Sequence, residues 1–368
     1  MELYFLNEDF THASMPVDDF ESFTWETRSD EAGAFSLHLR STRIQDALKA
    51  TYIFNSEAAS LGIIEDITVN SQKGAGLEIR GSTIEGLLRR RVIDSGGQFE
   101  AETVEAALYA AFTQYGFDGE RLLPGLEKGE LKGYPDTGTI TAEPGATLHD
   151  ALYKAAQTYR MRPEFYFDYL ENRLYFGIYK GVDHTVSQDE NGWVIFSQSF
   201  ENIKDSRYER SAGNYCNFAY VTMENDAYYG RVVITLDEVQ EGEPRLETYI
   251  PTSVSSEAYT NANGVLVPKY ILGVCKRMML DEAREVMAEK KKVENVSGAF
   301  VETKSFEYRK DFFVGDLVSF DSPELGIQVD AQVTGCTEIY ENGRKSVEIQ
   351  IGKDLSPVRK LKKIVKKG

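Results

Sequence analysis

The chain has 368 residues, of which 42% are hydrophobic and 12% aromatic, and its formal net charge is −18. This length is typical of two to four domains, and this composition supports a sizeable core and excludes global disorder. The negative charge argues against binding nucleic acid over a broad face, because phosphate contacts need lysine and arginine, although an acidic wall would let DNA pass without adhering.

The N-terminal 94 residues have the pattern of a small β-barrel or sandwich. The opening MELYFLNEDF alternates like a strand and lacks the basic segment and cleavage site of a signal peptide. Further short runs with period-two alternation follow, with one short helix near residues 43–50. Ser82 and Glu85 form a possible capping box that opens a helix over residues 83–92. No run approaches the roughly 20 apolar residues of a membrane span, so we expect no membrane anchor.

Residues 95–192 have the pattern of an α+β domain. Apolar residues at helical spacing predict helices over residues 102–115 and 147–159. Two alternating runs, PEFYFDYL and RLYFGIYK, are joined by Glu171 and Asn172, which favour a tight turn. We therefore predict a β-hairpin after the second helix.

Beyond Trp193 the pattern returns to strands, interrupted by a helix over residues 268–289. The fold class that we predict is therefore α+β, mainly β. We assign a second β domain to residues 193–255 and 295–353, a helical connection to residues 256–294, and a basic tail to residues 354–368.

The sequence carries few signals of site chemistry. Cys216, Cys275 and Cys336 lie in no CxxC motif or Cys/His cluster, so we expect buried or semi-buried thiols and neither a zinc site nor a disulfide framework. The motifs HExxH, His-x-His and Gly-x-Ser-x-Gly are absent, and no run has the spacing of an EF-hand loop. We expect no cofactor.

Asp183 and His184 are adjacent in a turn between two strands, which could indicate a proton-transfer site. Such a site also needs a nucleophile and an orienting group, and the sequence supplies neither. An aspartate after a glycine in a turn more often accepts hydrogen bonds from its own backbone. We therefore interpret this pair as part of a turn that holds two strands in register.

Two tryptophans raise the alternative of a carbohydrate-binding module. Alternation places Phe23 and Trp25 on one strand face, which favours packing in the core over an exposed platform for sugars. The carbohydrate alternative would require Trp25 or Trp193 to be exposed to solvent.

Several separated motifs resemble a single family. They are FESFTW (residues 20–25), GAFSL (33–37), GIIE (62–65), IRG (79–81) before a run LLRRR, YKG (179–181), VIFS (194–197), FEN (200–202), YCNFA (215–219) and DFFVGDLV (311–318). In this order and spacing the chain resembles the tail hub proteins of siphophages. These are related to the N-terminal part of tail-associated lysins and similar in fold to the baseplate hubs of contractile tails. The resemblance extends to about Asp354.

The resemblance implies two β-barrel-like, tail-tube-type domains in each subunit, with α+β domains inserted. It further implies a homotrimer whose six similar units form a ring around a channel for DNA in transit. The ring would lie between the distal tail or tube protein ring above and a tip spike, fibre or lysin protein below, in the baseplate of a virion assembled from protein made in the bacterial cytoplasm. The scaffold positions that match the family are Glu21, Trp25, Gly33, Phe35, Glu65, Gly81, Arg90, Gly181, Asp183, Thr185, Phe196, Asn202, Asn217, Gly315 and Asp316.

This sequence departs from the family pattern in two places. His184 stands where an arginine is more usual, so no role is carried over to it. Many lysin-type relatives continue into a peptidoglycan hydrolase or fibre-binding domain, whereas this sequence ends soon after the last β block. We therefore expect a structural protein and not an enzyme, with any enzymatic role belonging to another chain.

The alternative function is a cell-wall-degrading tail enzyme, an endopeptidase or a glycosidase. Two carboxylates among the 59 acidic residues could be arranged for glycoside hydrolysis. The basic tail is either a solvated tail or a further candidate site that docks on an acidic tip partner. The residues concerned are Arg359, Lys360, Lys362 and Lys363.

Overall fold

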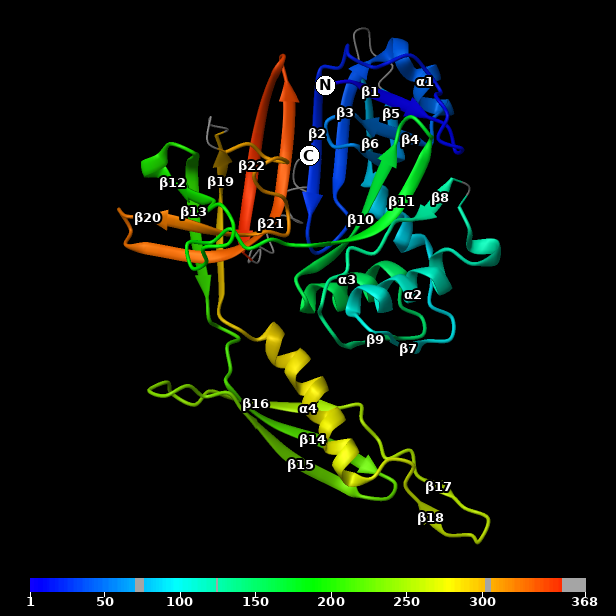
Figure 1. Cartoon of the computed structure of the whole chain (residues 1–368), viewed down its shortest axis with the longest axis vertical. Coiled ribbons are helices and arrows are strands. Elements are labelled where there is room, and N and C mark those ends of the chain that lie inside the picture. Colours follow the sequence, from blue (N-terminus) through cyan, green and yellow to red (C-terminus); the bar gives the residue numbers. More distant parts are fainter. Residues whose placement is uncertain (70–75, 124, 302–305, 353–368) are drawn as a thin grey trace. The chain divides into compact units, whose positions relative to one another are not determined.

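The computed structural model describes residues 1–69, 76–123, 125–301 and 306–352. They divide into two compact units. Of these described residues, unit 1 contains those within 1–208 and 295–352, and unit 2 contains residues 209–294. Unit 2 is therefore an insertion between the central and C-terminal segments of unit 1, and Figure 1 labels the elements of both.

Unit 1 is built on one large, mainly antiparallel sheet, whose first half comes from the N-terminal residues (Figure 1). Alternating side chains of these strands point inward, and Trp25, Phe35 and Leu37 are almost completely buried. A 3-10 turn (Ser41–Arg43) and helix α1 (Ile44–Lys49) lead from the third strand to the fourth. In spatial order the strands are β1 (Leu3–Leu6), β4 (Tyr52–Asn55), β5 (Ser60–Val69), β6 (Gly76–Thr83), β3 (Ala34–Arg40) and β2 (Ser22–Arg28).

The second half of the sheet comes mainly from the C-terminal residues. Strand β2 pairs with the C-terminal half of β21 (Ile327–Glu341), so early and late segments of the chain share one sheet. A bulge between Val333 and Gly335 interrupts β21, and bulges bend strands. Before the bulge β21 pairs with β20. The other strands are β22 (Arg344–Gly352), β19 (Val293–Phe300), β13 (Ile203–Ser211), β20 (Leu317–Ser322) and β12 (Ile195–Ser197). Strand β12 leads into the 3-10 turn η4 (Gln198–Phe200).

The order of strands in the large sheet shows whether the two expected β-barrels form. In the described part of the chain, the main path of the sheet begins at β1 and ends at β13 and does not close on itself. The mainly β, α+β class is therefore confirmed, whereas two separate closed barrels are not observed among these residues. The physical reason is the pairing of β2 with β21, which merges the strands expected to form one barrel with those expected to form another.

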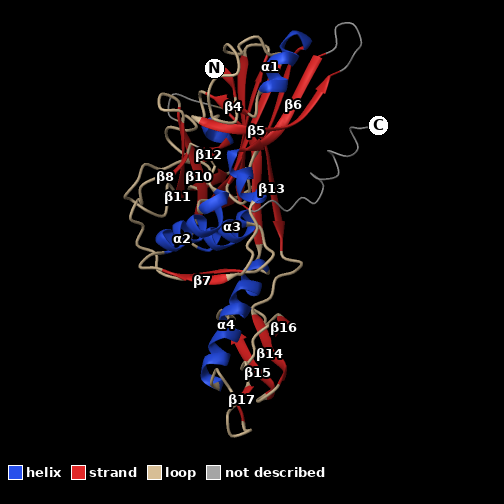
Figure 2. Cartoon of the chain, turned by 90° about the vertical axis from the view of Figure 1, so that its right-hand side faces the viewer, coloured by secondary structure: helices blue, strands red, loops and turns tan. Residues whose placement is uncertain are grey.

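The helical part of unit 1 packs on the same core as the first strands. Helices α2 (Val104–Gly116) and α3 (Leu148–Thr158) lie side by side (Figures 1 and 2). Phe112 of α2 stacks on Phe176 with ring centroids 3.7 Å apart. The remaining elements are η2 (Ile84–Arg90), β7 (Gly97–Glu100), η3 (Gly119–Arg121), β8 (Leu126–Lys128), β9 (Thr139–Ala142), β10 (Met161–Asp168) and β11 (Arg173–Lys180).

The helices and the hairpin expected in this part are confirmed, with one local correction. Strands β10 and β11 pair across the turn that contains Asn172, whose φ of 52° suits an asparagine. The segment after β6 is the 3-10 helix η2 and not an α-helix, and the expected capping box is wrong. The Ser82 hydroxyl donates instead to Glu65 Oε1, 2.8 Å away on the neighbouring strand.

Unit 2 is a three-stranded sheet with a helix on one face. Helix α4 (Leu272–Glu289) covers that face through Cys275, Met279 and Ala283, which are fully buried. Its start is four residues later than expected from the sequence. The strands are β14 (Phe218–Asp226), β15 (Gly230–Asp237) and β16 (Glu247–Thr252), and a small hairpin of β17 (Tyr259–Thr260) and β18 (Leu266–Val267) precedes the helix.

Two expectations about the whole chain can be compared with the structure. The three cysteines are buried and free, as expected. Among the described residues, none forms part of a helix with both the length and the apolar character that a membrane crossing requires.

Candidate functional site

The clearest cluster of family-matching residues joins the end of β11 to the loop before β20, and we call it the Asp316 junction. The Asp316 side chain is completely buried. Its carboxylate accepts hydrogen bonds from the backbone N–H groups of Val182 and Phe313, both at 2.8 Å, and from the Tyr179 hydroxyl. One carboxylate therefore fixes two segments that lie more than 130 residues apart in the sequence.

A close backbone approach completes the Asp316 junction. A Cβ atom on Gly181 would lie 1.9 Å from the Gly315 carbonyl oxygen, so only glycine fits there. Gly315 has a φ of 110°, which also favours glycine. The two glycines thus allow β11 and the loop before β20 to meet.

The side chain of Asp183 binds within its own turn and does not pair with His184. Asp183 Oδ1 accepts hydrogen bonds from the backbone N–H of Thr185 at 2.9 Å and from its hydroxyl at 2.8 Å. The Nδ1 atom of His184 lies 2.7 Å from the Gly192 carbonyl oxygen, so the two side chains have separate partners. This arrangement agrees with the turn interpretation, since the aspartate is occupied by its own backbone.

The electrostatics of the Asp316 junction also indicate a structural role. Burial and the neighbouring Asp316 carboxylate raise the pKa of the Tyr179 hydroxyl far above its ordinary value, so the hydroxyl stays a hydrogen-bond donor. The Arg162 guanidinium lies 4.9 Å from the Tyr179 ring centroid, and its Nε donates to the Val314 carbonyl at 3.2 Å. These contacts hold β10 and β11 against the loop before β20.

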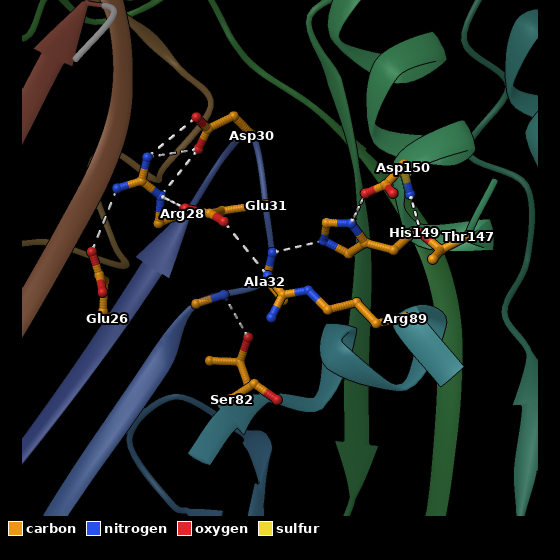
Figure 3. Close-up of polar contacts among 12 residues, drawn as sticks. Glu26, Arg28, Asp30, Glu31, Ala32, Ser82, Arg89, Thr147, His149 and Asp150 are labelled. Carbon is orange, nitrogen blue, oxygen red and sulfur yellow. Dashed lines mark hydrogen bonds and ion pairs between the residues drawn. The ribbon is translucent and has the colours of Figure 1, made fainter. Parts of the chain in front are cut away.

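A second cluster joins the turn between β2 and β3 to helix α3, and we call it the His149 junction (Figure 3). His149 is buried, and its Nε2 accepts a hydrogen bond from the Ala32 backbone N–H at 3.1 Å. Its Nδ1 lies 2.9 Å from Asp150 Oδ1, which identifies Nδ1 as the protonated nitrogen. Arg28 pairs with Asp30 in the same turn at 3.1 Å, as Figure 3 shows.

Replacing His149 by leucine is expected to lower the free energy of unfolding of unit 1 by about 1–3 kcal/mol, because the buried Ala32 N–H loses its acceptor. The variant His149→Gln, which retains an acceptor, should lose less. Urea unfolding followed by tryptophan fluorescence measures both, since Trp25 and Trp193 belong to unit 1. Equal losses in the two variants would contradict the role of this hydrogen bond.

A third group of family-matching residues lies in the first half of the large sheet. Trp25 is 1% exposed and stacks on Phe35 with ring centroids 6.0 Å apart, so it belongs to the core, as expected. The Gly33 N–H donates to the Thr83 hydroxyl at 2.9 Å. A Cβ atom on Gly81 would lie 1.7 Å from a backbone oxygen of the adjacent strand, so the strands approach closely at this point.

The remaining scaffold positions are dispersed. Glu21 and Arg90 are exposed, and Phe196 is a fully buried core residue. Asn202 and Asn217 are buried amides. The Asn202 side chain hydrogen-bonds to backbone groups of residues 195 and 197, and the Asn217 side chain hydrogen-bonds to backbone groups of residues 244 and 246. The matching residues are therefore spread over the large sheet, η2, the Asp316 junction and unit 2, and are not gathered in one cleft. The proposed docking residues of the basic tail lie outside the described residues.

An ion-pair network around a buried carboxylate on β21 was not predicted from the sequence. Glu338 is 1% exposed, and its carboxylate pairs with Arg309 at 2.6 Å and with Lys345 at 3.1 Å. The neighbouring Tyr340 hydroxyl donates to Glu57 Oε2 at 2.6 Å. Lys345 lies on the next strand of the same hairpin, but Arg309 and Glu57 come from more distant parts of the chain, so no local motif could identify them.

The carbohydrate alternative required an exposed tryptophan. Trp193 is 50% exposed, and its Nε1 donates to the Gln188 carbonyl oxygen at 2.7 Å. Because Trp25 is buried, Trp193 offers a single exposed indole to a ligand. Single exposed aromatic residues are common on protein surfaces and identify no site. Within the described ranges, no group of His, Cys, Asp or Glu side chains is arranged to hold a metal ion.

Solved structures of tail proteins have the same fold as this chain over almost its full length. A tail protein from Neisseria meningitidis MC58 is 13% identical, with a TM-score of 0.57 and coverage of 96% of both chains. The 43 kDa tail protein of prophage MuSo2 from Shewanella oneidensis is 14% identical, with a TM-score of 0.55 and coverage of 95% of this chain and 98% of the other. Prophage tail protein gp18 from Listeria monocytogenes EGD-e is 14% identical, with a TM-score of 0.54 and full coverage of both chains.

The family comparison agrees with the resemblance inferred from the sequence motifs. The model of the family described as siphovirus ReqiPepy6 Gp37-like protein matches residues 2–353, which include every motif that carried that resemblance. No curated protein matches the sequence. The chain therefore belongs to the siphovirus ReqiPepy6 Gp37-like family and has the fold of phage tail proteins.

Proposed function

We propose that this tail protein is a structural hub at the tail tip, the baseplate, of a phage or a phage-derived particle. The observation that carries the proposal is the fold similarity to phage and prophage tail proteins over almost the whole chain. The junctions around Asp316 and His149 support a structural role, because they fix distant segments with buried side chains. In this proposal the scaffold positions stabilise the subunit and catalyse no reaction.

The proposed assembly is a homotrimer in which the two halves of the large sheet act as two tail-tube-type units. Three subunits would supply six similar units around a channel, which lets a six-fold tube meet a three-fold tip. A closed ring with cyclic symmetry also shields sheet edges that would otherwise aggregate. The net charge of −18 suits a channel through which DNA passes without adhering.

The proposed partners follow from this position. The ring would contact the distal tail or tube protein ring on one side and a spike, fibre or lysin protein on the other. The basic tail is the proposed docking segment for the tip partner. Deleting residues 358–368 should then impair recruitment of the tip, and normal tail assembly and tip recruitment after this deletion would exclude that role.

Sedimentation equilibrium of the purified protein tests the assembly. We expect a mass three times that of the 41.5 kDa chain, because the proposed ring contains three subunits. A cell-wall clearing assay with the same preparation should show no activity. A single-chain mass at every concentration, together with clearing of cell walls, would instead support the alternative of a tail enzyme.

A further inference from the structure

Strand β15 (Gly230–Asp237) is an open edge of the three-stranded sheet of unit 2 (Figure 1). Among the described strands it pairs only with β14, so the backbone N–H and C=O groups on its other side face no strand of this part of the chain. Unpaired backbone groups along an edge are a template on which a further strand can add.

Strand β15 lacks the features that usually protect an edge strand from pairing. Its interior, residues 232–236, contains no charged residue, no proline and no glycine, and the register shift against β14 lies beyond this stretch. Charges, prolines and bulges are the common means of protection. The other edge strand of the same sheet, β16, contains Pro251, and residues 12–17 pair along the outer side of β1 in unit 1. The edge of β15 is therefore available for pairing.

The two faces of β15 differ in character. Val232, Ile234 and Leu236 belong to the core that packs against α4, but Val232 and Ile234 are only partly buried. Because side chains alternate along a strand, Arg231 and Asp237 lie on the opposite face, near its two ends, with two uncharged residues between them. A strand added at this edge would complete the burial of the partly buried side chains and would meet one positive and one negative charge.

The sequence of β15 is complementary to a second copy of itself in antiparallel orientation. When Ile234 lies opposite its own copy, Arg231 of each chain lies opposite Asp237 of the other. In the same register Val232 lies opposite Leu236, on the face that packs against α4. Opposite charges and apolar pairs across antiparallel strands are both stabilising. A shift by two residues in either direction, which keeps the two faces matched, separates both charge pairs.

We propose that two copies of this chain pair through β15 and join their three-stranded sheets into one continuous sheet, with a two-fold axis beside Ile234. The charge pattern selects a second copy as the occupant, because the reversed strand supplies a partner for both Arg231 and Asp237 in the register that also matches the apolar face. A two-fold contact cannot lie within a three-fold ring, so the pair joins subunits of two rings or subunits outside a ring. Eight paired residues make a small contact, which is typical of weak association.

Disulfide trapping in the full chain tests this pairing. Opposite residues of antiparallel strands have Cα atoms about 4.5–5.5 Å apart, which is within reach of a disulfide. The variant Ile234→Cys places a thiol opposite its own copy, so mild oxidation should give a disulfide-linked dimer on a non-reducing gel. The three native cysteines are buried, so the wild-type protein gives the background.

Val232→Cys is the matched control on the same face of β15. In the proposed register its two copies are offset by four residues along the strands, more than about 13 Å, so the yield of dimer should stay at the wild-type level. No dimer from Ile234→Cys, or equal yields from the two variants, would overturn the proposal. Neither result would affect the proposed ring, which the mass and the images of the particles test separately.

An exchange of charges tests the register. In the Ile234→Cys background, Arg231→Asp creates two pairs of like charges between the strands and should slow disulfide formation about tenfold. Adding Asp237→Arg restores both pairs with the positions exchanged and should restore the rate. The loss of the Arg231–Glu224 pair within one chain is common to both variants, so it cannot explain a recovery. Circular dichroism verifies folding, and a folded double variant as slow as the single one would overturn the choice of a second copy.

Discussion

Replacing Asp316 by alanine is expected to lower the free energy of unfolding of unit 1 by about 3–5 kcal/mol. The Asp316 carboxylate is completely buried and accepts hydrogen bonds from Val182, Phe313 and Tyr179. Alanine removes the acceptor of all three part-buried donors, and each buried group that is left unpaired costs free energy. The loss should appear as a lower midpoint in urea unfolding followed by tryptophan fluorescence.

Two further variants make this experiment specific. Asp316→Asn keeps the size of the side chain and one acceptor oxygen, so its loss should be intermediate. Glu324→Ala removes an exposed carboxylate in the same half of the sheet and should change the free energy of unfolding by less than about 0.5 kcal/mol. A loss in Asp316→Ala no greater than that in Glu324→Ala would show that the Asp316 junction is unimportant for stability.

Replacing Gly81 by alanine should destabilise unit 1 by about 3 kcal/mol, at the upper end of what overpacking usually costs. The added Cβ would lie 1.7 Å from the Ile63 carbonyl oxygen and 2.8 Å from the Phe35 ring. Since the first contact is with backbone, β5 and β6 must separate to relieve it. The same movement would disturb the stacking of Phe35 on Trp25, so the fluorescence of the folded protein should change as well.

Gly97 provides the matched control for this substitution. It also lies in a strand of unit 1, but a Cβ atom there would meet no atom within 4 Å. Gly97→Ala should therefore leave the urea midpoint nearly unchanged. If both alanine variants unfold at the wild-type midpoint, the close approach of β5 and β6 does not constrain Gly81.

Local patterns in the sequence predicted the local structure well. Helical spacing located α2 and α3, and the Glu171–Asn172 turn located the hairpin of β10 and β11. The turn interpretation of Asp183 depended only on its immediate neighbours, and Thr185 is indeed its partner. These features were accessible because the interacting residues are close in the sequence.

The partners across the junctions could not be predicted in this way. His149 contacts Ala32 across 117 residues, and Tyr179 contacts Asp316 across 137 residues. The pairing of β2 with β21, which joins the two halves of the sheet, likewise depends on register between distant strands. In unit 2, strands β14 to β16 pair with one another and pack on α4, although their sequences alternate like those of the large sheet. Alternation alone specifies a half-buried strand and not its partner.

Single-particle electron microscopy of the purified protein, with class averages along the ring axis, tests the hub assignment most directly. We expect three-fold rings with six lobes of density around a central opening. Such rings would also locate the channel through which DNA is proposed to pass. Compact single-chain particles without a ring, in a preparation that clears cell walls, would contradict the account and favour the tail enzyme.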